Sequence, residues 1–218
     1  MQRRKLIGAA CISLLAVGAC AQTEFFDDFE DGSVNPAYQF VVGDALSVLE
    51  GDPCRTWGGC LQRKNNAYFF LPHIPGNPEW VTTQITPGVL IELDVIQVGA
   101  SSIVELAVAD SIDNPQDYFA LKVEIDPATS DSKFICYDET ERVPLEGSLT
   151  FPLHMSFTVD TSGTTYGIIS DGVSEIECPL HSAVSSDTLA PAIVLWSFEE
   201  DGLAWVDNFC VTLLSQSI

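Results

Sequence analysis

The sequence predicts an all-β protein built as a sandwich of two antiparallel sheets. From Phe25 onward, short runs rich in valine, isoleucine, phenylalanine, tyrosine and threonine alternate with glycine, proline, asparagine, aspartate and serine. Several runs alternate apolar and polar residues with a period of two, and no window shows the periodicity of an amphipathic helix. One buried and one wet face per strand is typical of antiparallel sheets. Without helices to cover a parallel sheet, two sheets packed face to face are the simplest arrangement.

The alternation places the individual strands. In the run from residue 89, Val89, Ile91 and Leu93 fall on one side, whereas Glu92 and Asp94 fall on the other. The clearest predicted strands are Val89 to Val98, Ile103 to Ala109, Tyr118 to Ile125, Leu153 to Val159, Ile193 to Phe198 and Leu203 to Leu213. The strongest hairpin signals are Asp171-Gly172 and Asp201-Gly202, because an Asp-Gly pair tolerates the positive φ of a tight turn.

The first 19 residues are typical of a secretory signal peptide. Arg3, Arg4 and Lys5 precede an uncharged stretch that is too short to span a bilayer core of about 30 Å, and small residues follow it. Two alternative processing sites at the end of this segment stay open. Residues 16–20 resemble a bacterial lipobox with lipidation at Cys20, whereas residues 19–21 fit an ordinary A-x-A cleavage site. Both predict an extracytoplasmic, secreted or lipid-anchored protein, with residues 20–218 forming one domain.

Composition excludes some partners. The 218 residues carry nine basic and 31 acidic side chains, a formal net charge of −22. Nucleic-acid binding relies on lysine and arginine to release counterions, so this charge argues against nucleic acid and against an anionic bilayer surface. We expect contact with a membrane only through an N-terminal lipid. Oligomeric state is not predicted.

The cysteines predict two disulfides. Cys54 and Cys60 flank a short loop that would present Trp57, and Cys136 and Cys178 both lie in strand-like runs. Cys210 alternates with Val206 and Asn208 in the last predicted strand and is the candidate for a buried thiol.

Residues 26–32, Phe-Asp-Asp-Phe-Glu-Asp-Gly, and 205–209, Trp-Val-Asp-Asn-Phe, resemble the first and last strands of concanavalin A-like jelly rolls. This superfamily includes laminin G-like and MAM-like modules and bacterial family-16-type glucanases. Residues 153–160 with Thr165-Tyr166 and Asp171-Gly172 resemble the laminin G-like stretch that passes the ligand edge. The resemblance implies a jelly-roll sandwich and a structural Ca²⁺ ion where the first and last strands meet, at Asp28, Glu30 and Asp207. Oxygen ligands of this kind suit calcium.

Catalytic residues are not predicted. Glucanases of this fold use a Glu-x-Asp-x-x-Glu arrangement, and glycoside hydrolysis needs two carboxylates. Glu124-Ile125-Asp126 is the local match considered, but it lacks the second glutamate, and Glu175 and Glu177 lack the intervening aspartate. His154 is expected to be an exposed imidazole with a single hydrogen bond.

A sugar site needs aromatic faces and a few polar groups. Trp57, Trp80, Tyr166 and Trp196 are the candidates. The sequence therefore predicts a non-catalytic module that binds carbohydrate or another cell-surface ligand. Two alternatives stay open: a glycoside hydrolase or polysaccharide lyase on the same fold, and a structural envelope or adhesion module.

Overall fold

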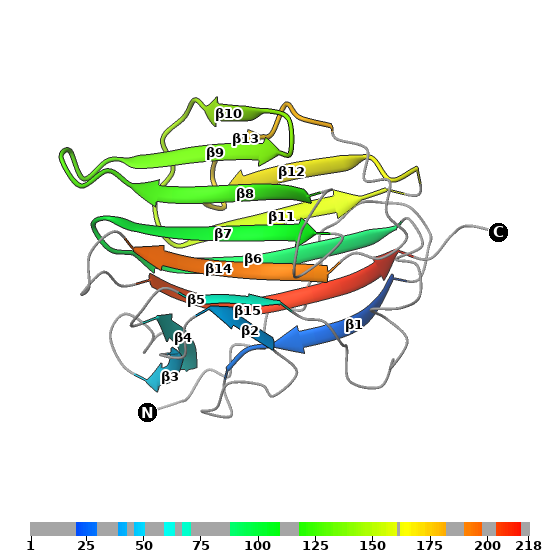
Figure 1. The fold of residues 1–218 in the computed structure, drawn as a ribbon, viewed down its shortest axis with the longest axis horizontal. Coiled ribbons are helices and arrows are strands. Elements are labelled where there is room, and N and C mark those ends of the chain that lie inside the picture. The colour runs from blue at the N-terminus through cyan, green and yellow to red at the C-terminus, as the bar shows by residue number, and fades with distance from the viewer. Residues whose placement is uncertain are drawn as a thin grey trace.

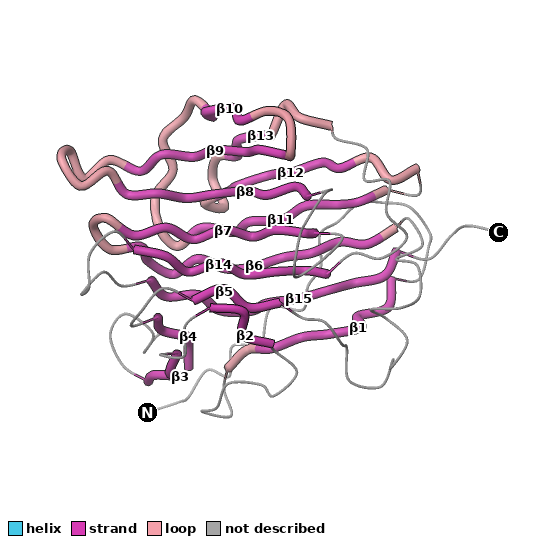
Figure 2. The backbone as a smooth tube through the Cα atoms, viewed as in Figure 1, coloured by secondary structure: helices cyan, strands magenta, loops and turns pink. Residues whose placement is uncertain are grey.

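A computed structural model describes residues 21–29, 39–42, 46–50, 59–63, 67–70, 88–109, 118–160, 162–181, 190–197 and 204–214. The predicted signal peptide and Cys20 lie outside these ranges. Within them the chain forms fifteen strands and no helix, and Figure 2 shows strands and loops only. Every strand pairing among these residues is antiparallel. No described helix is therefore long and apolar enough to cross a membrane.

The strands form two sheets that lie face to face (Figure 1). The first sheet contains, in spatial order, β13 (Glu175–Glu177), β12 (Thr165–Ser170), β11 (Leu153–Val159), β6 (Val89–Val98), β15 (Ala204–Leu214), β4 (Gly59–Arg63) and β3 (Leu46–Glu50), with β1 (Ala21–Asp27) also paired to β15. The second contains β10 (Arg142–Leu145), β9 (Ser132–Asp138), β8 (Tyr118–Ile125), β7 (Ser102–Ala109), β14 (Ala190–Ser197), β5 (Ala67–Phe70) and β2 (Gln39–Val42). The predicted all-β sandwich is confirmed.

The core lies between the inward faces of the two sheets. Val89, Ile91 and Leu93 of β6 are completely buried, as the period-two pattern predicts. Phe157 of β11 and Phe119 of β8 meet edge to face with ring centroids 5.6 Å apart, so the two sheets interlock here.

One glycine sets how closely the sheets approach. A Cβ atom on Gly167 of β12 would lie 2.7 Å from Leu121 Cδ2 and 3.1 Å from Phe119 Cζ, both on β8. A side chain here would force Leu121 and Phe119 of the opposite sheet to shift. The absence of a side chain at residue 167 thus allows β12 to pack tightly on β8.

The first and last strands are neighbours, as predicted. β1 pairs with β15 from Ala21 opposite Leu214 to Asp27 opposite Phe209, and Figure 1 shows the blue and red strands side by side. The Phe25 and Phe209 rings lie 5.9 Å apart and join the main core. This contact joins residues almost two hundred positions apart in the chain.

One of the two predicted hairpins is correct. β12 and β13 pair on either side of Asp171-Gly172, where Asp171 Oδ1 accepts hydrogen bonds from the N–H groups of Val173 and Ser174. The strands that flank Asp201-Gly202 lie in different sheets, so the hairpin predicted there is wrong. Residues 201 and 202 themselves lie outside the described ranges; β14 before them pairs with β7 in the second sheet, whereas β15 after them pairs with β6 in the first.

The disulfide between Cys136 and Cys178 is confirmed, with Cα atoms 5.9 Å apart. It links β9 of the second sheet to the residue that follows β13 in the first. Cys210 keeps its thiol and is buried, with Sγ 3.6 Å from Thr212 Oγ1. Cys54 lies outside the described residues, as does the side chain of Cys60, so the other predicted bridge stays a prediction.

Candidate functional site: the outward face of strand β6

Strand β6 presents a polar side to the outside of the first sheet. Its inward residues form the core, and Glu92 and Asp94 alternate onto the opposite face. Glu92 is 2% exposed, whereas Asp94 is half-buried. Two carboxylates thus lie on one face of a central strand, in separate environments.

A β-bulge adds a third side chain to this row. Val206 of β15 pairs with Val95, but the preceding residue, Trp205, pairs with Gln97, so Ile96 is an extra residue on β6. After the bulge, Val98 points into the core and Gln97 is exposed. Gln97 consequently lies on the same face as Glu92 and Asp94, although it is an odd number of residues away from both.

The neighbouring strands add two more polar groups. His154 of β11 lies directly opposite Asp94, and its Nδ1 is 2.8 Å from Asp94 Oδ1 while its Nε2 is 3.2 Å from Glu92 Oε1. On the other side, the Asn208 amide donates a hydrogen bond of 2.8 Å to Asp94 Oδ2. Both oxygens of Asp94 are therefore held, one by each flanking strand.

Asn208 reaches Asp94 because β15 is also bulged. Asp207 pairs with Asp94 and Cys210 pairs with Glu92, so two residues of β15 occupy the space opposite one residue of β6. Asn208 has a φ of 51°, in the left-handed region that asparagine tolerates better than most residues. We call Glu92, Asp94, Gln97, His154 and Asn208 the β6 face.

Electrostatically, the β6 face is a histidine held between two carboxylates. The hydrogen bond with Asp94, followed by that with Glu92, raises the pKa of His154 to about 9 against the opposing effect of burial. At neutral pH the imidazole is therefore protonated and offsets part of the acidic charge. The expectation of a single hydrogen bond to His154 is wrong, because pairing with β6 brings two acids to the same ring.

The acidic row on β6 matches the glucanase pattern Glu-x-Asp-x-x-Glu more closely than Glu124-Ile125-Asp126 does. Residues 92–97 read Glu-Leu-Asp-Val-Ile-Gln, with Glu92 and Asp94 at the first two acidic positions of Glu-x-Asp-x-x-Glu and Gln97 at the third. Glu124-Ile125-Asp126 lies on the other sheet, at the end of β8. Glu124 is on the second sheet, 2.8 Å from Lys122 Nζ and 3.9 Å from Arg142 Nη2.

The structure also places the other carboxylates of the two incomplete motifs. Asp126 pairs with Lys133 in the turn between β8 and β9. Glu175 and Glu177 are exposed on the three-residue edge strand β13. Asp126 lies away from the β6 face, whereas Glu175 and Glu177 share its side of the sheet, separated from β6 by β11 and β12.

Of the predicted sugar-binding aromatics, the structure describes the side chain of Tyr166 alone. Tyr166 is 45% exposed on β12, and it pairs with Thr158, which places it on the same side of the sheet as the β6 face. Trp57 and Trp80 lie outside the described residues, as does the side chain of Trp196. A fifth aromatic, Trp205, was not among the candidates and lies half-buried against Ile96, opposite Gln97.

The predicted calcium ligands lie only partly within the described residues. Asp207 is buried on β15 and accepts a hydrogen bond from the N–H of Asn208, Asp28 is half-buried after β1, and Glu30 lies outside the described part. Among the residues that the structure describes, no three histidine, cysteine or acidic side chains are grouped so that they could hold a metal ion. The calcium site stays a prediction, which depends on Glu30.

Solved structures with the same architecture include carbohydrate-active proteins. Domain 4 of AbnA, a GH43 extracellular arabinanase from Geobacillus stearothermophilus in complex with arabinotriose, matches with a TM-score of 0.53 and 10% identity, covering 90% of this chain and 95% of that one. SCLam, a non-specific endo-β-1,3(4)-glucanase from family GH16, matches with a TM-score of 0.56 and 10% identity, covering 89% and 92%. The β-glucanase of Bacillus licheniformis gives 0.52 and 10%, covering 88% and 98%.

The chain has a concanavalin A-like jelly-roll fold. The resemblance stated from the end strands is thus confirmed at the level of the fold. Neither a family model nor a curated protein matches the sequence. The fold does not determine the activity, which depends on the side chains of the site.

Proposed function

We propose that this protein is an exported, non-catalytic carbohydrate-binding module whose glycan lies across the β6 face. The observation that carries the proposal is Gln97, which occupies the third position of the Glu-x-Asp-x-x-Glu row. Glycoside hydrolysis needs one carboxylic acid to protonate the leaving group and a second carboxylate to act as nucleophile or base. An amide cannot supply that proton.

The remaining groups on this face suit binding. Asp94 accepts hydrogen bonds, Gln97 and Asn208 carry amides that both donate and accept, and the His154 side chain is 42% exposed. Sugar hydroxyls need this mixture of donors and acceptors. Tyr166 and Trp205 supply aromatic surface on the same side of the sheet. The site therefore combines apolar contact with a few fixed polar groups.

Export is supported by the disulfide. Disulfides persist in oxidising compartments and are rare in the cytosol, so the Cys136–Cys178 bridge agrees with the predicted signal peptide. Lipidation at Cys20 would tether the module to the bacterial envelope, and cleavage after Ala21 would release it.

The test is binding to insoluble and soluble polysaccharides, measured by pull-down and affinity electrophoresis on β-glucans and arabinans. We expect the wild-type protein to bind at least one of them, and Gln97→Ala and Asp94→Asn to bind about tenfold more weakly. Glu139→Gln, in the exposed turn between β9 and β10 of the second sheet, is the matched control and should bind as the wild type does. Failure of the wild type to bind any polysaccharide would favour the structural or adhesion module.

A glycan-active enzyme is the second candidate, because Glu92 and Asp94 keep two of the three acids of the glucanase row. The same samples are assayed for release of reducing ends and of unsaturated uronates. We expect no release. Turnover by the wild type that is lost in Glu92→Gln would replace the binding proposal with a hydrolase or lyase.

A further inference from the structure

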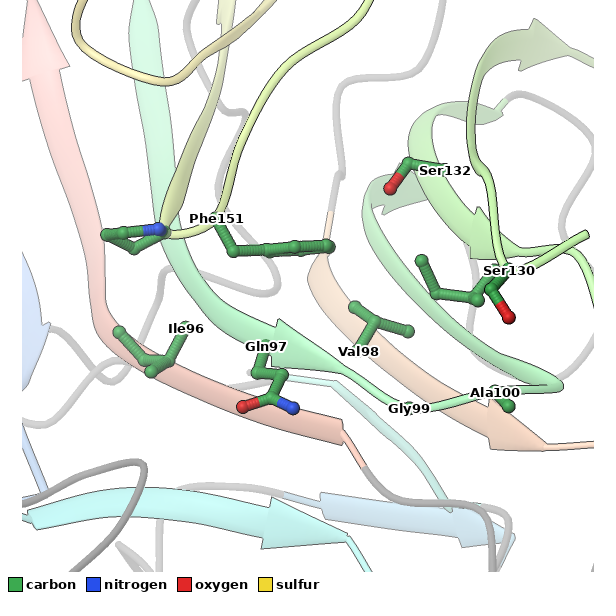
Figure 3. Close-up of a pocket in the computed structure, with 10 residues that line it drawn as sticks. Ile96, Gln97, Val98, Gly99, Ala100, Ser130, Ser132 and Phe151 are labelled. Carbon is green, nitrogen blue, oxygen red and sulfur yellow. The ribbon is translucent and has the colours of Figure 1, made fainter.

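A cavity of about 630 Å³ opens at one end of the sandwich. It lies where the turn between β6 and β7, the turn between β8 and β9 and the segment before β11 come together (Figure 3). Its volume falls within the range of about 300 to 1,000 Å³ that is typical of small-molecule sites. The cavity is therefore large enough for an organic ligand.

The described lining residues are uncharged. None of the ten residues that the structure describes around the cavity is acidic, basic or histidine, in a chain whose net charge is −22. The nearby carboxylate of Asp126 is paired with Lys133 and accepts a hydrogen bond of 2.8 Å from the N–H of Ala128, so its charge is balanced within its own turn. An anionic ligand would find no cation among these residues, and the overall field of the protein repels it.

The lining combines one aromatic ring with small hydrogen-bonding groups. Figure 3 shows Phe151 reaching into the space between Ile96 and Val98 of β6 on one side and two serines on the other: Ser130 in the turn before β9 and Ser132, the first residue of β9. Phe151 is half-buried and packs against the main core, which holds its ring in place. Aromatic faces with hydroxyl and amide groups around them are what an uncharged sugar ring requires.

The serine side of the cavity is preformed. In the turn from β8 to β9, the Ser130 N–H donates to the Asp126 carbonyl at 2.8 Å, and the Asp126 N–H donates to the Asp131 carbonyl at 3.0 Å. These hydrogen bonds hold Ser130 at a φ of 62°. A ligand would therefore enter a wall that is already ordered, with little ordering cost.

Gln97 connects this cavity to the β6 face. It is the last member of the polar row on β6 and also one of the residues that line the cavity. A glycan that follows the row from Asp94 past Gln97 would reach the opening. We propose that the cavity binds the uncharged terminal sugar of the glycan whose next units lie on the β6 face, so that the protein recognises neutral chain ends. This inference rests on the proposed function.

The experiment measures binding of short neutral sugars to the full chain by saturation-transfer NMR and calorimetry. Laminaribiose, cellobiose and arabinobiose are the neutral probes, and digalacturonate is the anionic comparison. Ser132→Leu fills the cavity and Phe151→Ala removes its ring, whereas Ser174→Leu adds the same side chain to an exposed turn outside the cavity and serves as control. Circular dichroism and thermal unfolding identify any variant that does not fold. If Phe151→Ala does not fold, the test relies on Ser132→Leu.

We expect at least one neutral disaccharide to bind, with an affinity about tenfold lower in Ser132→Leu and unchanged in Ser174→Leu, and no binding of digalacturonate. If the disaccharide binds equally well to Ser132→Leu but is lost in Asp94→Asn, the cavity inference is overturned while the proposed function stands. Polysaccharide binding by the wild type without binding of any neutral disaccharide also overturns the inference alone. If no saccharide of any length binds the wild type, both fall together.

Discussion

Replacing His154 by glutamine should lower the free energy of unfolding near pH 6 and leave that free energy almost unchanged near pH 10. In the native protein the imidazolium lies 2.8 Å from Asp94 and 3.2 Å from Glu92, and these contacts raise its pKa from 6.5 to about 9. A pKa that is raised by folding stabilises the native state fully below the unfolded value. The contribution then disappears as the pH rises from about 6.5 to about 9.

The shift also sets the size of the effect. At 1.36 kcal/mol per pKa unit, a rise to about 9 would correspond to about 3.4 kcal/mol. The His154 side chain is 42% exposed, however, and solvent screens exposed ion pairs strongly. We therefore expect His154 to contribute about 1 to 2 kcal/mol near pH 6 and close to zero near pH 10.

The assay is urea unfolding of the wild type and of His154→Gln at about pH 6 and about pH 10, followed by tryptophan fluorescence. The difference in unfolding free energy between the two proteins should shrink by about 1 to 2 kcal/mol at the higher pH. His181→Gln, an exposed histidine near the end of the same sheet, controls for general effects of pH. An equal difference at both pH values, or an NMR titration of His154 with a midpoint near 6.5, would refute the reasoning.

Three other predictions concern stability. Cys136→Ser with Cys178→Ser should lower the unfolding free energy by about 4 kcal/mol, because the bridge closes a loop with a sequence separation of 42, and no change in the urea midpoint would contradict this. Phe157→Ala should lower the free energy of unfolding by about 3 to 5 kcal/mol, because the buried contact with Phe119 is lost. Ser156→Ala, on the outward face of the same strand, should change that free energy by less than about 0.5 kcal/mol. Similar melting temperatures for the two variants would argue against the interlocked core. If calcium binds where β1 meets β15, EDTA should lower the melting temperature of the wild type but not that of Asp207→Asn. If the wild type melts at the same temperature with EDTA and with excess calcium, the result counts against the site.

The strands could be predicted because they follow a local rule. β6, β8 and β11 have the bounds that alternation gives, since each strand has one face in the core and one face outside. The pairing of β1 with β15 was available through the resemblance of the two ends to known strands.

The candidate site was missed because it depends on distant pairing. Alternation alone puts Gln97 on the opposite face from Asp94, and only the bulge imposed by Trp205 and Val206 returns it to the same side. The contact of His154 with two acids likewise depends on the register of β11 on β6, which no local pattern encodes. The signal that could have identified the row is the spacing Glu-x-Asp-x-x-Gln itself, with an amide accepted at the third position.

The placement of β15 constrains when the molecule can fold. β6, the longest strand before it, has β11 on one side and β15 on the other, and β15 in turn holds β1 and β4. Until residues 204–214 have been synthesised, β6 keeps an open edge and β1 and β4 lack this partner strand. The part of the first sheet from β6 to β13 can pair once residue 177 is present, whereas the part from β15 to β1 and β4 is completed last, by contacts that are distant in sequence.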